Sequence, residues 1–299
     1  MDGVGLGTDN PANPLAFQDN PLAFLSRLLG SPLIAGLEIN QPNLLLKAID
    51  ATLGVPGLPQ SATGQTALYT GRNAPVYMGR HLTGFANGSL RILIEESGLF
   101  KQVLAAGGTA THANLYTPAY FEAIEQRKLR YSVGTLLNLT AGLPFRMPAD
   151  YERGEALFWD ITNQYGYERN PAYPTLEPQE AGRRLARLAD KYDVTLFECY
   201  LTDFAGHRQD LAQAREVLQI VDGFIEGIVS EKAQDITLVI SSDHGNIEDL
   251  SRKTHTLNPV PLLVIGPQAA AFSSIEDITG ITPVLVKLIE EKYNKRAIG

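Results

Sequence analysis

The chain contains little sulfur and little histidine, and acidic residues outnumber basic ones. Its 299 residues include one cysteine and five histidines, and 33 acidic against 25 basic residues give a formal net charge of −8. An intrachain disulfide is therefore excluded. Cys199 lies in the apolar run 194–201, which indicates a buried small hydrophobe rather than a nucleophile. A single cysteine is typical of a reducing compartment, so we expect a cytoplasmic protein.

The sequence also lacks the features that mark membrane and nucleic-acid partners. No run of 18 apolar residues occurs, and no basic stretch followed by an apolar one opens the chain, so neither a transmembrane helix nor a signal peptide is expected. The acidic balance argues against binding nucleic acid or anionic membranes, which needs a basic face. A small anionic substrate stays possible if bound cations reverse the local field. The pattern does not indicate an oligomeric state.

The second half of the chain alternates between helical and strand patterns. The expected helices are 179–192, 210–230 and 281–292, and the expected strands are 194–201, 236–240 and 260–265. Strands that are apolar on both faces and separated by helices predict an α/β fold with a mostly parallel sheet and helices on both faces. In such a sheet, ligands gather beyond the carboxyl ends of the strands.

The first half is less regular and contains much glycine and proline. The pattern predicts helices at 22–29, 44–53, 61–70, 90–97 and 100–106, and a short strand at 33–37. Residues 128–178 are rich in proline, arginine and aromatic residues and interrupt the alternation. They are either a small inserted cap over the strand ends or an elaborated loop. Residues 1–127 and 179–299 would then form the α/β core, which holds the candidate metal ligands described next.

Three of the five histidines lie near aspartates, in Asp203-x-x-x-His207, in Asp243-His244 and around His255. Neutral imidazole and carboxylate are common protein ligands of Zn²⁺ and Mn²⁺. On a helical turn, Asp203 and His207 would share one face. Each motif alone has an ordinary structural explanation, such as a helix cap or a hydrogen-bonded turn. Together, the three favour a metal site.

Two further residues are candidates for the same site. Asp2 precedes a glycine-rich stretch that allows a tight turn past a carboxylate, although a frayed terminus is the simpler reading. Ser61 would open a helix, where free backbone N–H groups favour an anion; the simpler reading is a capping serine. Next to a metal, a serine oxygen can be deprotonated and attack phosphorus. Thr63 is a weaker candidate for that role.

These segments, in this order, resemble the alkaline phosphatase superfamily. The most similar branch is that of cofactor-independent phosphoglycerate mutase and phosphopentomutase. The matching segments are Asp2-Gly, Ser61-Ala-Thr-Gly64, Thr70-Gly71, Asp203…His207, Asp243-His244-Gly-Asn and Thr254-His255-Thr…Asn258-Pro-Val-Pro. The resemblance covers residues 1–110 and 180–299 approximately.

The resemblance implies two divalent metal ions, manganese or zinc. Asp203, His207 and His255 would hold one ion. The other ion would be held by Asp2, Ser61, Asp243 and His244. Two metals about 3.5–4 Å apart can clamp the attacking and leaving oxygens of a phosphoryl transfer. Ser61 would attack to give a phosphoserine intermediate, and water or a second hydroxyl of the same substrate would then accept the phosphoryl group.

The chain departs from the branch in three places. Gln65 stands where the mutases have histidine, and residues 128–178 are short for a mutase cap. Met1 directly precedes Asp2, where the family has an apolar strand, so the first core strand is apparently missing at the N-terminus and we expect a gap in the core.

Because exclusion of water separates a mutase from a phosphatase, we expect a hydrolase of small phosphate esters. The alternatives are a phosphomutase acting on a phosphosugar or phosphoglycerate, and a catalytically impaired metal-binding protein. The substrate-binding residues are not identified: Arg127, Arg130, Arg146 and Arg153 could clamp a phosphate, and no pattern selects one of them.

Overall fold

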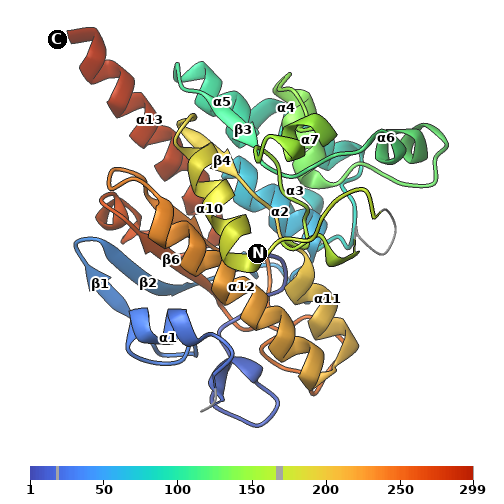
Figure 1. Ribbon diagram of the computed structural model, residues 1–299, viewed down its shortest axis with the longest axis vertical. Coiled ribbons are helices and arrows are strands. Elements are labelled where there is room, and N and C mark those ends of the chain that lie inside the picture. Colours follow the sequence, from blue (N-terminus) through green and yellow to red (C-terminus); the bar gives the residue numbers. More distant parts are fainter. Residues whose placement is uncertain (18–19, 166–170, 299) are drawn as a thin grey trace.

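The computed structural model describes residues 1–17, 20–165 and 171–298, and it has a mixed α/β architecture (Figure 1). The strands are β1 (Ile39–Gln41), β2 (Leu44–Ile49), β3 (Ala110–His112), β4 (Val194–Leu196), β5 (Leu238–Ile240) and β6 (Val260–Ile265). The α-helices in the first half are α1 (Ala23–Leu29), α2 (Ser61–Thr70), α3 (Ala74–Met78), α4 (Gly88–Ser97), α5 (Leu99–Ala105), α6 (Pro118–Glu125), α7 (Val133–Thr140) and α8 (Pro148–Glu152). Those in the second half are α10 (Pro178–Ala189), α11 (Leu201–Arg208), α12 (Leu211–Glu231) and α13 (Ile281–Ile298). Short 3₁₀ turns occur at Pro14–Ala16, Ala269–Phe272 and Ile278–Gly280.

The strands form two separate sheets. A four-stranded sheet has the order β1-β2-β6-β5, and β3 pairs with β4 in a second sheet. Every pairing in the larger sheet is antiparallel, and within the described ranges only β3 and β4 are a parallel pair of named strands. The predicted α/β class is confirmed, but the mostly parallel sheet is wrong. The reason is local: β1 and β2 form a tight hairpin, and β6 runs against both of its neighbours.

Apolar side chains cover both faces of the larger sheet. Along β6, Leu263 and Ile265 pack with residues of α10 and α12, whereas Leu262 and Val264 pack with residues of α2 and α4. This alternation follows from the two-residue period of a strand. The run Val260–Ile265 is buried throughout, which explains why its sequence is continuously apolar.

Most of the predicted elements are present, with three corrections. Residues 44–53, predicted as a helix, contain β2, because the run Leu44–Ile49 pairs with β1 on one side and β6 on the other. The predicted strand 33–37 is not a strand; the described chain turns there. The predicted strand 194–201 ends at Leu196, because the chain leaves the sheet and α11 begins at Leu201.

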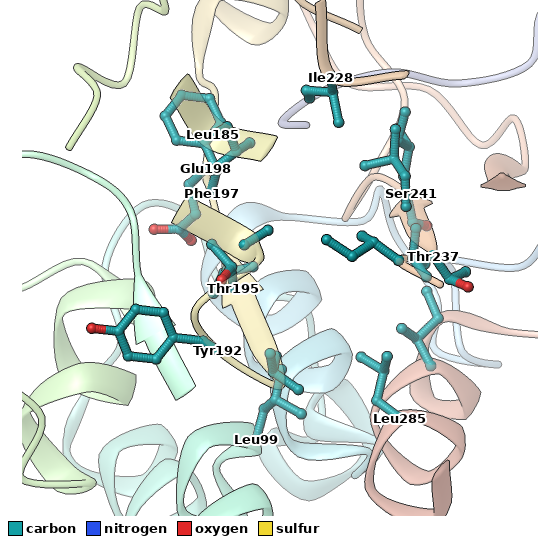
Figure 2. Close-up of a pocket in the computed structure, with 18 of the residues that line it drawn as sticks. Leu99, Leu185, Tyr192, Thr195, Phe197, Glu198, Ile228, Thr237, Ser241 and Leu285 are labelled. Carbon is teal, nitrogen blue, oxygen red and sulfur yellow. The ribbon is translucent and has the colours of Figure 1, made fainter. Parts of the chain in front are cut away.

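The beginning of the chain runs between the two sheets. The ammonium group of Met1 donates to the Ser241 carbonyl at 2.8 Å, and the amide of Asp2 donates to the Cys199 carbonyl at 2.9 Å. A cavity of about 660 Å³ lies between β4 and β5 at this point (Figure 2). Asp2 is therefore anchored between the segments that follow these two strands.

The segment 128–178 is joined to the smaller sheet through its described residues. Arg146 and Leu157 form isolated bridges with Leu115 and Asn114, just beyond β3. Val133 of α7 is buried in an apolar cluster with residues of α4 and α5. Within the described ranges, no helix combines the length and the apolar composition needed to cross a membrane.

Candidate metal centre

Five segments that are distant in the sequence converge on one site. Ser61 is the first residue of α2, Asp203 and His207 lie on α11, and Asp243-His244 follows β5. Asp2 and His255 complete the site from the start of the chain and from the loop before β6. Close approach is needed here: a Cβ atom at Gly64 would lie 2.6 Å from the Asp243 carbonyl oxygen. A glycine in α2 therefore lets the helix contact the Asp243 segment and places Ser61 beside His244.

The first of two groups of candidate ligands is deeply buried. It consists of Asp2, Asp243 and His244, with one ligand atom from each lying within 4.8 Å of the others. The Nε2 atom of His244 lies 3.1 Å from Asp2 Oδ1 and 3.6 Å from Asp243 Oδ2. The Ser61 hydroxyl oxygen lies 3.0 Å from the same nitrogen. Oxygen atoms from three side chains thus lie within 3.6 Å of His244 Nε2.

Within the described residues, three of the four carboxylate oxygens of this group receive no hydrogen bond. Among the described residues, no hydrogen bond is directed to Asp2 Oδ1 or to either carboxylate oxygen of Asp243. Burial, together with the charge of Asp243, raises the pKa of Asp2 to about 7. Burial opposes protonation of His244, but the Asp243 and Asp2 carboxylates outweigh it and raise the pKa of His244 to about 10. Buried carboxylates without donors are costly unless a cation neutralises them, and a divalent metal fits this donor set.

The second group is closer to solvent and contains Asp203, His207 and His255. The Nδ1 atoms of His207 and His255 each lie 2.8 Å from a backbone carbonyl, that of Lys253 and that of Pro59 respectively. Because a carbonyl only accepts, each Nδ1 carries the proton and each Nε2 presents a lone pair.

These two lone pairs face each other and a carboxylate. The two Nε2 atoms are 3.3 Å apart, and they lie 3.3 and 3.6 Å from oxygens of Asp203. Acceptors that converge in this way require a cation, and histidines whose other ring nitrogen is hydrogen-bonded to a carbonyl are typical metal ligands.

The two groups are adjacent. The rings of His244 and His255 stack with centroids 3.6 Å apart and an interplanar angle of 12°. Burial and the neighbouring His244 lower the pKa of His255, which keeps its imidazole neutral and able to bind a metal. The predicted site residues therefore all lie in one place, in the two groups described.

The structure also shows supporting contacts that the sequence did not predict. Gln65 donates to Asp2 Oδ2 at 3.2 Å, and Asn246 donates to Asp203 Oδ1 at 2.6 Å. The buried Glu248 accepts from the amides of Gly5 and Asn246 at 2.8 and 2.7 Å, which ties the start of the chain to the loop after β5. Of these three residues, only Asn246 lies within a sequence motif. Glu248 is an acidic residue in a loop, and its sequence context does not predict that it is buried.

The serine and the threonine of α2 have different environments. The Ser61 hydroxyl faces His244, as described. The side chain of Thr63 is buried, and its hydroxyl donates to the Gln60 carbonyl and accepts from the Leu82 amide, both at 3.2 Å. The Thr63 oxygen is thus already used within the fold.

The candidate arginines lie away from the ligand groups or have other partners. Arg146 is buried and donates to Thr111 and to the Tyr192 hydroxyl. Arg153 pairs with Asp150 at 2.6 Å. Arg127 and Arg130 are exposed. Among the described hydrogen bonds and ion pairs, none joins either arginine to a candidate metal ligand.

Sequence comparison finds a family match in the second half of the chain and relatives that match about two fifths of it. Residues 156–291 match the family described as the Metalloenzyme superfamily. The 2,3-bisphosphoglycerate-independent phosphoglycerate mutase of Desulforudis audaxviator is 33% identical over 137 residues, which is 40% of this chain and 26% of the relative. The enzyme of that name from Yersinia pestis is 31% identical over 117 residues, or 36% and 23%. The matched part therefore spans about a quarter of the length of these relatives.

Structural comparison extends the likeness to nearly the whole chain. A cold-active alkaline phosphatase from a psychrophilic Shewanella sp. has a TM-score of 0.52 at 14% identity, and the match covers 97% of this chain and 98% of that one. At this identity, the match shows a shared fold alone. Together with the sequence matches, it confirms the resemblance to the alkaline phosphatase superfamily and, within it, to the phosphoglycerate mutase-like branch.

Proposed function

We propose that this chain is a metal-dependent phosphoryl-transfer enzyme, and specifically a phosphate ester hydrolase that works through a phosphoserine at Ser61. The observation that carries the proposal is the position of the Ser61 hydroxyl, 3.0 Å from His244 Nε2 and beside the carboxylates of Asp2 and Asp243. Three of these four carboxylate oxygens receive no hydrogen bond from the described residues. A hydroxyl held at a cation site is the arrangement that an activated oxygen nucleophile needs.

The two ligand groups would hold two divalent ions, manganese or zinc. Asp203, His207 and His255 form one set of ligands. The other set consists of Asp2, Ser61, Asp243 and His244. When bound, such ions supply Lewis acidity and favour the alkoxide form of a coordinated hydroxyl. The donor sets mix nitrogen and oxygen, which suits both metals.

The chain itself provides the nucleophile and its orientation. Ser61 is the first residue of a ten-residue helix, so the backbone N–H groups of the first turn and the helix dipole favour a phosphate at this point. Attack by Ser61 Oγ on phosphorus would expel the alcohol of the ester. Water would then release phosphate from Ser61.

The segment 128–178 remains our candidate for a cap over a core formed by residues 1–127 and 179–299. The short length of the segment supports hydrolysis, because only an active site that excludes water retains a phosphoryl group for return to the substrate. The substrate is expected to be a small phosphorylated molecule. The single, buried Cys199 fits a reducing, cytoplasmic setting.

A phosphomutase acting on a phosphosugar or phosphoglycerate is the second candidate, and the names of the matching relatives favour it. It would use the same Ser61 and the same ligands but return the phosphoryl group to another hydroxyl of the substrate. A third candidate, a catalytically impaired metal-binding protein, would bind the ions without turnover.

The test compares Ser61→Ala with wild type after loading with manganese or zinc. We expect the turnover of an aryl phosphate to fall on the order of 10³-fold or more, with the metal content largely retained. Ser274→Ala is the matched control, because Ser274 is an exposed serine. Equal activity in wild type and Ser61→Ala would remove Ser61 from the mechanism.

The products separate the three candidates. Phosphorus NMR on a panel of sugar phosphates and phosphoglycerates would show free phosphate from a hydrolase and a relocated phosphate from a mutase. A fully metal-loaded protein with no turnover of any ester would favour the binding protein.

A further inference from the structure

Phe204 is an exposed aromatic residue beside the second group of candidate ligands. It follows Asp203 on α11 and is 48% exposed. Residues three and four apart on a helix are neighbours, with about 5–6 Å between their Cβ atoms. Phe204 therefore adjoins His207 toward one end of α11 and Tyr200 toward the other. The Phe204 amide donates to the Tyr200 carbonyl at 3.2 Å, so the helical turn includes both residues.

Leu257 is a second exposed apolar residue at the same group. It is 62% exposed and lies two residues after His255. Thr256, between them, forms a bridge with Gly245, so the chain is extended here, and residues two apart in an extended chain point to the same side. A single exposed leucine or phenylalanine is ordinary, but two that adjoin one ligand group give the metal centre an apolar rim.

The ring of Phe204 is part of an aromatic shelf that also contains Trp159 and Tyr200. Trp159 belongs to the segment 128–178. Its ring stacks on Phe204 with centroids 5.5 Å apart and an interplanar angle of 25°, and it lies 6.0 Å from the Tyr200 ring. The Tyr200 hydroxyl already donates to Glu198 at 2.9 Å. Tyr200 and Phe204 therefore present carbon rather than polar atoms, and nearly parallel rings can be extended by one more planar group.

A strained, buried turn holds Trp159 in place. The residues after it include Ile161 and Asn163, whose φ angles of 67° and 62° lie in the left-handed region, which a β-branched residue rarely adopts. The buried Asp160 carboxylate accepts from the amides of Asn163 and Tyr165 at 3.1 and 2.9 Å and so stabilises the turn. Backbone strain persists only where surrounding contacts enforce it, and it concentrates at functional sites.

The proposed reaction determines which part of a substrate meets the apolar rim. As the bond from Ser61 Oγ to phosphorus forms, the bond from phosphorus to the ester oxygen would break on the opposite side. The serine proton would pass to water, and the departing oxygen would take a proton from water. Ser61 contacts His244 of the first group, and His255 of the second group stacks on His244. The leaving alcohol therefore extends over the second group, toward Phe204 and Leu257.

We propose that the aromatic shelf and Leu257 bind a planar, apolar group on the leaving alcohol, so that the chain selects phosphate esters of alcohols that carry an aromatic ring. This inference rests on the proposed function, because attack by Ser61 fixes where the alcohol lies. Stacking on Phe204 would remove carbon surface of both partners from water. A sugar or glycerate would instead leave hydroxyl groups against carbon surface without hydrogen-bond partners.

The principal experiment measures binding rather than activity. Trp159 is the only tryptophan of the chain, so its fluorescence reports events on the shelf. The metal-loaded protein is titrated with phenylpropylphosphonate and with propylphosphonate, in which a methylene group replaces the ester oxygen of phenethyl phosphate and of ethyl phosphate. We expect the aromatic phosphonate to change the fluorescence saturably and to bind more tightly than propylphosphonate by about tenfold or more.

Variants of Phe204 test whether the shelf is responsible. Phe204→Ala should reduce the preference for the aromatic phosphonate to about threefold or less, because the stacking partner is gone. Phe204→Tyr keeps a ring and should keep the preference. Ile92→Ala is the matched control, since Ile92 is 51% exposed on α4, and it should behave as wild type.

Three binding results would overturn the proposal. They are equal affinities for the two phosphonates, a preference that survives in Phe204→Ala, and no saturable response to either compound. A Trp159 signal that changes on dilution of the free chain but not with either phosphonate would also overturn it, because another copy of the chain would then cover the shelf.

Turnover separates failure of this inference from failure of the proposed function. Phenethyl and ethyl alcohol have similar acidity, so the ratio of kcat/KM for their phosphates reports recognition of the ring. We expect Phe204→Ala to lower kcat/KM for phenethyl phosphate about tenfold and to change that for ethyl phosphate by less than about twofold. Equal turnover of both esters by wild type would overturn the aromatic shelf and leave the hydrolase intact. Selective binding without turnover of either ester would support the shelf and contradict the hydrolase.

Discussion

Glu198 and Asp243 are both buried carboxylates in the segments that follow neighbouring strand ends, and their surroundings differ sharply. Glu198 accepts hydrogen bonds from the hydroxyls of Tyr69 and Tyr200, both at 2.9 Å, and lies 3.4 Å from His112 Nε2. Asp243 receives no hydrogen bond on either oxygen from the described residues.

The difference teaches how to separate a structural carboxylate from a ligand. Burial would raise the pKa of Glu198, but the neighbouring His112 imidazole and the hydrogen bonds from two tyrosine hydroxyls hold its pKa below the usual range. The fold therefore satisfies Glu198 with its own donors. Asp243 instead shares the His244 imidazole with the Asp2 carboxylate and receives no hydrogen bond from the described residues. One imidazolium does not neutralise two carboxylates, so further positive charge must come from outside.

The largest expected effect comes from removing the charge at Asp243. Asp243→Asn keeps the size of the side chain but weakens an anionic ligand, so we expect affinity for the metal of this group to fall about 10²-fold or more. The metal-free variant should be about as stable as metal-free wild type, because the Asp243 carboxylate repels that of Asp2 and receives no hydrogen bond from the described residues. Elemental analysis after dialysis and denaturant unfolding measure the two effects.

The matched control is Glu198→Gln. It should keep its metal content but lose about 2–4 kcal/mol of stability, because donors built for a carboxylate lose their charged acceptor. The reverse pattern, with metal lost in Glu198→Gln and retained in Asp243→Asn, would break the comparison.

A smaller effect concerns pH. Since the pKa of Glu198 is lower in the folded chain than its ordinary value of 4.5, folding favours the ionised form. Its stabilising contribution is therefore complete above about pH 4.5 and is lost as the pH falls through the folded pKa. We expect the difference in melting temperature between wild type and Glu198→Gln to be constant from about pH 6 to 8 and to shrink below about pH 4.5. A difference that grows on acidification would contradict this account.

The sequence predicted which side chains lie together at the candidate metal centre better than it predicted the sheet. Asp203 and His207 could be placed together because helical spacing is a local property, and Asp243-His244 because a polar doublet after an apolar run is unusual. β2 was mistaken for a helix because its run is apolar on both sides, and such runs have no distinctive period. Its identity depends on pairing with β1 and β6, which are contacts across the chain.

The pairing of Glu198 with His112 could not be predicted either. The two residues are far apart in sequence, and neither lies in a recognisable motif. Their contact exists because β3 and β4 are neighbours, with His112 opposite Leu196 in the register. For the same reason, the sequence shows Gln65 as a departure from the family pattern but does not predict that its side chain donates to Asp2, because that contact joins distant parts of the chain.

The most direct test of the central claim is anomalous diffraction from crystals of the chain grown with manganese or zinc. The account predicts two metal peaks, one contacted by Asp2, Asp243 and His244 and the other by Asp203, His207 and His255, with the Ser61 hydroxyl facing the first. Well-ordered density for these side chains with no metal among them at saturating concentration, or metal bound only elsewhere, would contradict it.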